Sequence, residues 1–123
     1  MKKIGLMGAM KDEIAPLYEA MTDHREETVG GVVFYEGVLD GKDVVLCCAG
    51  MGKAQAAAAT QRLCSHFCVD AVLFSGIAGN MTSKVSVGDV IIGKTLVYHD
   101  GEPRMIAETA PFLQEFASDE KLI

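Results

Sequence analysis

Residues 3–21 read KIGLMGAMKDEIAPLYEAM and predict a strand, a tight turn and a helix in direct succession. The apolar run from Lys3 to Met7 is short and ends at Gly8, which is typical of a buried strand that stops at a turn. Apolar residues then recur at helical spacing, at Ile14, Leu17, Tyr18 and Met21. This succession indicates an α/β chain.

The first turn of the predicted helix is acidic. Asp12 and Glu13 lie where the helix macrodipole favours negative charge, and Pro16 comes early enough in the helix to be tolerated. The turn between the first strand and the first helix is therefore well specified.

A hairpin and a second helix are expected next. The runs Val32–Leu39 and Asp43–Cys48 are separated by Asp40-Gly41-Lys42, where Gly41 can take the positive φ that a hairpin turn needs. An alanine-rich segment after Lys53 then carries one apolar face at helical spacing, marked by Ala56, Ala59, Leu63 and Phe67. The small residues of this helix let it approach a sheet closely.

Two further apolar stretches predict strands. Val69–Phe74 is short and almost continuously apolar, so we expect a strand that is buried on both faces. Val90–Ile92 and Leu96–Tyr98 predict one long strand, or two strands broken at Gly93.

The last part of the chain has no clear period. We expect residues 99–115 to be mostly loop, with weak helical character around Phe112. Ser118 is a predicted N-cap of a helix whose first residues run to Ile123.

Length and composition limit the possible classes of protein. A chain of 123 residues suffices for one globular domain, and the order of predicted elements indicates a single α/β layered domain with a mixed sheet over residues 1–123. Half of the residues are apolar, so a packed core is expected. The formal net charge of -6 repels phosphate backbones and anionic lipid headgroups, so we expect no nucleic-acid or membrane partner.

The sequence predicts a soluble cytoplasmic protein. No uncharged stretch approaches the roughly 18 residues that span a bilayer. The apolar run Ile4–Met10 ends at charged residues and not at a cleavage site, so we expect no secretory signal and take residue 1 as the start of the chain.

The cysteines agree with a reducing compartment. Cys47 and Cys48 are adjacent and should point to opposite faces of a strand, whereas Cys64 and Cys68 should share one helix face. A metal site formed by Cys64, His66 and Cys68 is the alternative, but His66 falls on another face and no fourth ligand is near. We therefore expect buried reduced thiols, with no metal and no cofactor.

Three glycine-bearing turns follow the predicted strands Lys3–Met7, Asp43–Cys48 and Val69–Phe74, and ligands of open α/β sheets collect at such strand ends. These turns are Gly8-Ala9-Met10, Gly50-Met51-Gly52 and Gly76-Ile77-Ala78-Gly79. The alternative is that the glycines only close tight turns, but three turns at one edge favour a small-molecule site. The spacing matches neither a dinucleotide fingerprint nor a P-loop, so phosphate binding is not predicted.

Glu13 is the ionisable residue of most interest, because its carboxylate could reach this sheet edge. It would accept a proton from a bound water or hold a hydroxyl, and it would repel phosphate, which favours hydrolysis over phosphorolysis. The alternative is a solvated acidic side chain, which we expect for Asp12. His99 and Asp100 are either a strand-end turn or a second polar cluster.

Four methionines could line an apolar pocket or simply fill the core. They are Met7, Met10, Met51 and Met81.

The motifs, taken in order, closely resemble the N-terminal half of the 5'-methylthioadenosine/S-adenosylhomocysteine nucleosidases. They are Ile4-Gly5-Leu6-Met7-Gly8-Ala9-Met10 with Glu13-Ile14, Gly50-Met51-Gly52-Lys53 with Ala56-Ala57-Ala58, Ser75-Gly76-Ile77-Ala78-Gly79, Val87-Gly88-Asp89-Val90, and Tyr98-His99-Asp100. Together they are far more specific than any one of them.

The resemblance implies a three-layer αβα fold of the nucleoside phosphorylase type, usually a homodimer. It implies hydrolysis of the N-glycosidic bond of these nucleosides with release of adenine, a step of methionine salvage, without a cofactor. By the same resemblance, Glu13 holds and activates the attacking water. Substrate contacts are expected from Ala9, Met10, Met51, Ile77, Ala78 and Gly79, although Ile77 replaces the small polar residue common at its place.

In this family a second half supplies strands that complete the sheet, a Met-Glu pair that grips the ribose and an aspartate that protonates the adenine. None of these is found up to Ile123, and protonating a leaving group contributes on the order of 10²–10⁴-fold. We therefore expect the 123-residue chain alone to have activity near background. The alternatives are a non-catalytic purine-binding or dimerising remnant, a purine nucleoside phosphorylase, or a futalosine hydrolase.

Overall fold

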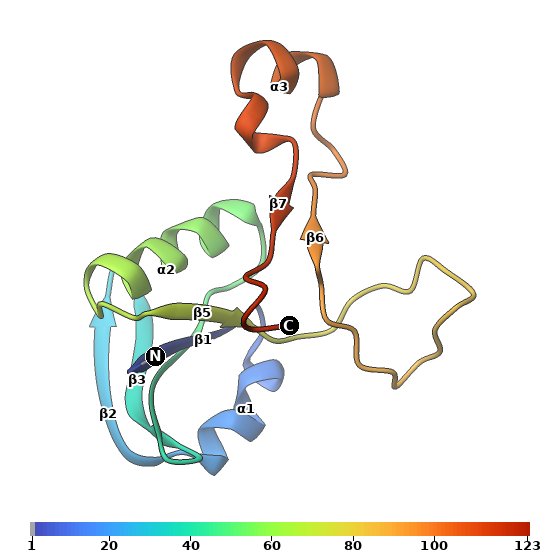
Figure 1. Ribbon diagram of the computed structural model, residues 1–123. Helices are drawn as coiled ribbons and strands as arrows, with labels where there is room; N and C mark the ends of the chain where they lie inside the picture. The colour runs from blue at the N-terminus through green and yellow to red at the C-terminus, as the bar shows by residue number, and fades with distance from the viewer. Residues whose placement is uncertain (1) are drawn as a thin grey trace. The chain divides into compact units, whose positions relative to one another are not determined.

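The computed structural model describes residues 2–123, which divide into two compact units with their boundary between Gly79 and Asn80 (Figure 1). The prediction that residues 1–123 form a single domain stays a prediction. The first unit holds a five-stranded sheet, two helices and the candidate site. The second holds a two-stranded ribbon and one short helix.

The sheet of the first unit is mixed, as predicted. Its strands are β1 (Lys3–Gly8), β2 (Thr22–Val29), β3 (Val32–Leu39), β4 (Lys42–Cys48) and β5 (Ala71–Phe74), in the spatial order β2-β3-β4-β1-β5. β1 runs parallel to β4 and β5, whereas β2, β3 and β4 pair antiparallel.

The predicted hairpin between β3 and β4 is confirmed. Leu39 pairs with Lys42, so the loop has two residues, and Asp40 and Gly41 have φ of 49° and 73°. Positive φ at both central residues is the two-residue turn that matches the twist of hairpin strands. The Asp-Gly sequence therefore sets the register of these strands.

The helices α1 (Lys11–Ala20) and α2 (Lys53–Ser65) lie on opposite faces of the sheet (Figure 1). Along β4, Val45 and Cys47 belong to the core under α2, and Val44 and Leu46 belong to the core under α1. The core under α2 is completed by Met7, Phe34, Ala49, Ala59, Leu63 and Phe67, and the core under α1 by Leu6, Ile14 and Met21. The predicted three-layer αβα architecture is confirmed.

One strand, β2, was not predicted from the sequence. β2 has the sequence TDHREETV, without alternating apolar residues, and it lies exposed at one edge of the sheet. Its register with β3 shifts between Thr22 and Arg25, next to Asp23 with a φ of 56°. Charged side chains and such an irregularity keep an edge strand from pairing with another chain.

The opposite edge is apolar. β5 pairs with β1 along one side only, and Leu73 and Phe74 are 37% and 57% exposed. The prediction of a strand buried on both faces is therefore wrong for the described chain, because the adjacent residues Leu73 and Phe74 point to opposite faces of the sheet and both are exposed.

In the second unit, β6 (Thr95–Leu96) pairs antiparallel with β7 (Phe116–Ala117). The predicted strand Val90–Ile92 is wrong, because these residues form no strand and are exposed. Leu96–Tyr98 contributes only its first residue to β6.

The helix α3 (Pro103–Thr109) and a 3-10 turn (Pro111–Leu113) replace most of the predicted loop. The side chain of Glu102 caps α3 by accepting from the Arg104 N–H, and Pro103 supplies the first-turn proline that helices favour. Ser118 caps no helix among the described residues. Its hydroxyl instead donates to the Gly93 carbonyl at 2.6 Å.

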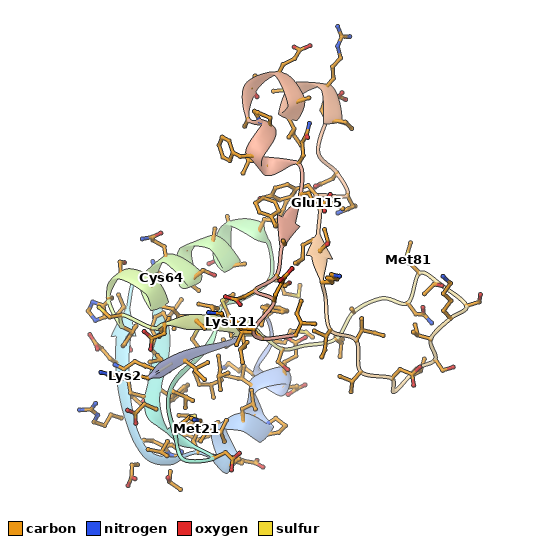
Figure 2. The ribbon with its side chains drawn as sticks, in the orientation of Figure 1. Lys2, Met21, Cys64, Met81, Glu115 and Lys121 are labelled. Carbon is orange, nitrogen blue, oxygen red and sulfur yellow. The ribbon has the colours of Figure 1, made fainter. Side chains whose placement is uncertain are left out.

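Cys47 and Cys48 point to opposite faces, as predicted, and burial raises the pKa of Cys47 to about 12. The prediction of buried thiols is wrong for Cys64 and Cys68, which are exposed, and Cys64 projects from the outer face of α2 (Figure 2). Cys68 also lies beyond the end of α2, with a φ of 54°, so it does not share a helix face with Cys64.

Two observations concern residues 2–123 only. No group of three His, Cys, Asp or Glu side chains among them could hold a metal ion. None of their helices has both the length and the apolar character needed to cross a membrane.

Candidate active site

The three glycine-bearing turns lie at one edge of the first unit. Because β4, β1 and β5 are adjacent and parallel, the segments that follow them leave the sheet at the same end. The Ala49 N–H donates to the Gly8 carbonyl at 2.8 Å, and the Ser75 N–H donates to the Met7 carbonyl at 2.9 Å. The backbone pairing therefore continues into the turns and fixes their relative positions.

The carboxylate of Glu13 joins two of these turns. Glu13 is the third residue of α1, and its Oε2 accepts from the N–H groups of Ala9 at 2.8 Å and Met10 at 2.9 Å. Its Oε1 accepts from the N–H of Ile77, in the turn after β5, at 3.0 Å. Three backbone donors from two segments thus orient one side chain.

Two glycines make room for this arrangement. A Cβ at Gly76 would lie 2.5 Å from Oε1 of Glu13, and a Cβ at Gly8 would lie 2.7 Å from Cγ2 of Ile14, both closer than real contacts allow. Gly50 and Gly52 instead have positive φ, 87° and 107°, so the turn after β4 needs glycine for its conformation. Glycine is therefore needed at position 76 to make room for the Glu13 carboxylate, and at position 8 to make room for α1, the helix that carries Glu13.

The hydrogen bonds keep Glu13 ionised. The N–H of Ile77, followed by that of Met10, holds the pKa of Glu13 below its ordinary value, and the N–H of Ala9 acts in the same direction. An ionised carboxylate offers about four acceptor positions, of which three are filled by backbone N–H groups. The remaining position, on Oε1, can accept a hydrogen bond from a water or a hydroxyl.

The other predicted site residues surround this carboxylate to different degrees. Ala9, Met10 and Ile77 contribute N–H groups to Glu13, so these donors are already used within the protein. The side chains of Met10 and Ile77 are 36% and 81% exposed. Ala78 and Gly79 continue from Ile77 as exposed, irregular chain. Their contacts with a substrate stay a prediction.

Met51 lines a groove that adjoins the site. The groove has a volume of about 810 Å³ and runs between α1, the turn that joins β2 and β3, and the turn after β4. It is lined by Lys11, Ile14, Ala15, Tyr18, Gly30, Gly31, Val32, Val33, Tyr35, Cys48, Ala49, Gly50, Met51 and Gln55. Of the four methionines considered for a pocket, Met7 is buried in the core, and Met81 is an exposed residue of the second unit (Figure 2).

Three residues near the site were not identified as site residues by the sequence analysis. The Cys48 thiol donates to the Ala9 carbonyl at 3.5 Å, and the rings of Tyr18 and Tyr35 meet edge to face at 4.7 Å in the groove. The signal for Cys48 was its place at the end of a strand that precedes a glycine turn. His99 and Asp100 form an exposed pair in the second unit, with Nδ1 and Oδ1 4.0 Å apart.

Comparison with known proteins places this geometry in a family. The model of the phosphorylase superfamily matches residues 3–123. The chain belongs to the phosphorylase superfamily. Within this superfamily, the chain is 39% identical over 127 aligned positions to the 5'-methylthioadenosine/S-adenosylhomocysteine nucleosidase of Marinomonas sp.. That alignment covers 100% of the chain and 55% of the relative, and a nucleosidase of Shewanella sp. is 42% identical over 80% of the chain and 42% of its own length.

Solved structures of superfamily members have the same fold. The nucleosidase of Neisseria meningitidis, in complex with methylthio-immucillin-A, matches with a TM-score of 0.91 and 37% identity over 99% of the chain and 55% of its own length. The nucleosidase of Colwellia psychrerythraea, in complex with adenine, matches with a TM-score of 0.92 and 35% identity over 98% of the chain and 52% of its own length. The predicted family resemblance and fold are confirmed, and the chain spans about half the length of the relatives it matches.

Proposed function

We propose that the protein hydrolyses the N-glycosidic bond of 5'-methylthioadenosine and S-adenosylhomocysteine and releases adenine. The observation that carries this proposal is the Glu13 carboxylate, which is held by three backbone donors and keeps one acceptor position open. The similarity to nucleosidases of this name supports the choice of substrates. As part of the same proposal, the enzyme is a cytoplasmic homodimer that acts in methionine salvage and binds neither nucleic acid nor membranes.

In the proposed reaction, water attacks C1′ of the ribose. The bond from the water oxygen to C1′ forms while the bond from C1′ to the base breaks, and the released electron pair goes to adenine, which takes up a proton from the solvent, while the proton that the water loses returns to the solvent through Glu13. Glu13 accepts a hydrogen bond from the water through Oε1 and thereby aims its oxygen at C1′. Once the water has bonded to the sugar, its proton can pass to the carboxylate.

The lowered pKa of Glu13 determines at which stage of the proposed reaction its carboxylate takes up a proton. A carboxylate that accepts three N–H bonds is a weak base and does not deprotonate free water. It does orient the water, and its negative charge stabilises the positive sugar that develops as the base departs. The same charge repels inorganic phosphate, so the site favours hydrolysis over phosphorolysis.

The proposal is tested by measuring adenine release from both nucleosides. The proteins compared are the 123-residue chain and a chimera in which this chain is followed by the part of the Marinomonas relative that it does not cover. We expect near-background release from the chain and turnover by the chimera, reduced by about 10²–10⁴-fold in Glu13→Gln. A folded chimera that releases no adenine, or one in which Glu13→Gln has no effect, would contradict the proposal.

Two controls test the substrate and the nucleophile of the proposed reaction. A futalosine hydrolase mutant of Helicobacter pylori matches the chain with a TM-score of 0.89 and 30% identity, so futalosine belongs among the substrates tested. Turnover should be independent of inorganic phosphate, because a phosphorylase would require it as the nucleophile. Phosphate-dependent release would instead favour a purine nucleoside phosphorylase.

The apolar edge favours a second candidate function, a non-catalytic module that associates through β5. Leu73 and Phe74 are exposed on a strand with unpaired backbone groups on its outer side, which invites association. Sedimentation velocity on the 123-residue chain tests this candidate. A monomer that also fails to bind adenine in calorimetry would count against it.

A further inference from the structure

Lys11 is the only charged residue among the described residues that line the groove next to Glu13. We propose that Lys11 and this groove select nucleosides whose 5'-thioether carries an amino acid, by binding the carboxylate of that amino acid. The inference rests on the proposed function and deepens it, because it assigns the residue that separates the longer proposed substrate from the shorter one.

The groove is continuous with the candidate site. Lys11 follows Met10, whose N–H is bound to Glu13. On the other side, Met51 follows the end of β4, where Cys48 is paired with Gly8 and its thiol reaches the Ala9 carbonyl. A nucleoside with its sugar at Glu13 therefore has the groove beside it, and a volume of about 810 Å³ lies within the range of pockets that hold small ligands, roughly 300–1,000 Å³.

The walls of the groove suit a thioether chain with a polar end. Ile14, Tyr18 and the thioether of Met51 offer apolar and polarizable contacts to sulfur and methylene groups. The Gln55 amide and the Tyr35 hydroxyl can pair with an ammonium or a carboxylate. Desolvation, followed by the nearby Glu26 charge, raises the pKa of Tyr35, so its hydroxyl stays protonated and able to donate.

The environment of Lys11 argues against a purely structural role. Among the described residues, no carboxylate forms an ion pair with the Lys11 ammonium. Lys11 is also the first residue of α1, where the helix macrodipole disfavours a cation. Neither an ion pair nor helix stability therefore accounts for a positive charge here, whereas a ligand carboxylate would. A methylthio group offers this charge nothing to bind.

The test is calorimetric binding of 5'-methylthioadenosine and S-adenosylhomocysteine to the 123-residue chain at low salt. The variants are Lys11→Gln, Lys11→Glu and the matched control Lys42→Gln, which removes the same charge at the far end of β4. We expect Lys11→Gln to weaken binding of S-adenosylhomocysteine by about two- to fivefold, as for an exposed ion pair, and to leave 5'-methylthioadenosine unchanged. Lys11→Glu should weaken binding of S-adenosylhomocysteine further, and high salt should remove the difference in affinity between the Lys11 variants and the unsubstituted chain.

The outcomes separate the inference from the function on which it rests. If both nucleosides bind and the Lys11 variants affect them equally, the inference is wrong and the proposed function stands. A loss of discrimination in Lys42→Gln as large as in Lys11→Gln would also overturn it, because the effect would then be one of net charge. If neither nucleoside binds to any of the folded proteins, the inference is wrong, whereas the proposed function is still judged by adenine release from the chimera.

Discussion

Alanine at position 76 should disconnect Glu13 from β5 while leaving the fold intact. The added Cβ would stand 2.5 Å from Oε1 and 2.7 Å from Cδ of Glu13, whereas ordinary contact begins at 3.4 Å. The carboxylate must therefore retreat by about 0.9 Å, the difference between 3.4 and 2.5 Å. Such a retreat is enough to break the 3.0 Å bond from the Ile77 N–H.

The expected magnitudes differ for activity and for stability. Misplacing a reacting group by about 1 Å can cost on the order of 10²-fold in rate, so adenine release by the chimera should fall by about this factor in Gly76→Ala. The side-chain end that moves is flexible, and Gly→Ala at a compatible φ stabilises a protein by about 0.4–1 kcal/mol through the unfolded state. The melting temperature should consequently change little.

A second measurement needs no turnover. Because the Ile77 N–H is the largest cause of the lowered pKa of Glu13, Gly76→Ala should raise the pKa of this carboxyl toward its ordinary value. NMR titration of the Glu13 side-chain carbon in the 123-residue chain would detect the change. The control is Gly93→Ala, since a Cβ at Gly93 meets nothing within 4 Å. An unchanged Glu13 pKa together with unchanged adenine release in Gly76→Ala would refute the reasoning.

Three further predictions concern stability and reactivity. The N–H of Lys3, followed by that of Lys2, lowers the pKa of Asp70. The contribution of Asp70 to stability is therefore present above its ordinary pKa and is lost as the pH falls through the lowered pKa of the folded state, so Asp70→Asn should reduce the fall of the urea unfolding midpoint at acid pH. Phe34→Ala removes a fully buried ring and should lower the free energy of unfolding, measured in urea, by about 3–5 kcal/mol. Phe112→Ala, at an exposed position, should lower it by less than about 0.5 kcal/mol. A thiol reagent should modify the exposed Cys64 rapidly and the buried Cys47 only on unfolding, as mass spectrometry of the labelled protein would reveal.

Local signals made part of the fold predictable. The strand, turn and helix of residues 3–21 and the Asp40-Gly41 hairpin follow from the period of apolar residues and the conformational freedom of glycine, and both are confirmed. β2 could not be found in this way, because its polar residues pair through the backbone at an exposed edge and need no apolar pattern. The helix α3 was missed for a related reason, since it buries no residue and has no apolar period to read.

The candidate site was predictable only up to its long-range contacts. Three glycine turns at one sheet edge followed from the order of strands and helices, but the use of Gly76 did not. Its missing side chain makes room for a carboxylate 63 positions earlier in the chain, and only the pairing of β5 with β1 brings the two together. Likewise, the proposed role of Lys11 could not be predicted from the sequence, because the groove that it lines is built by residues of four separate segments.

The contacts of Glu13 also bear on whether its role is structural or chemical. A glutamate at the third position of a helix commonly reaches back to the first backbone N–H groups, and the bonds from Ala9 and Met10 are of this kind. Helix capping does not explain the third bond, which comes from Ile77 in the turn after β5, nor the glycine that admits the carboxylate there. Capping alone would leave Oε1 in water. Holding that oxygen between two turns is what orienting a reactant would require, and this is why we propose a chemical role for Glu13.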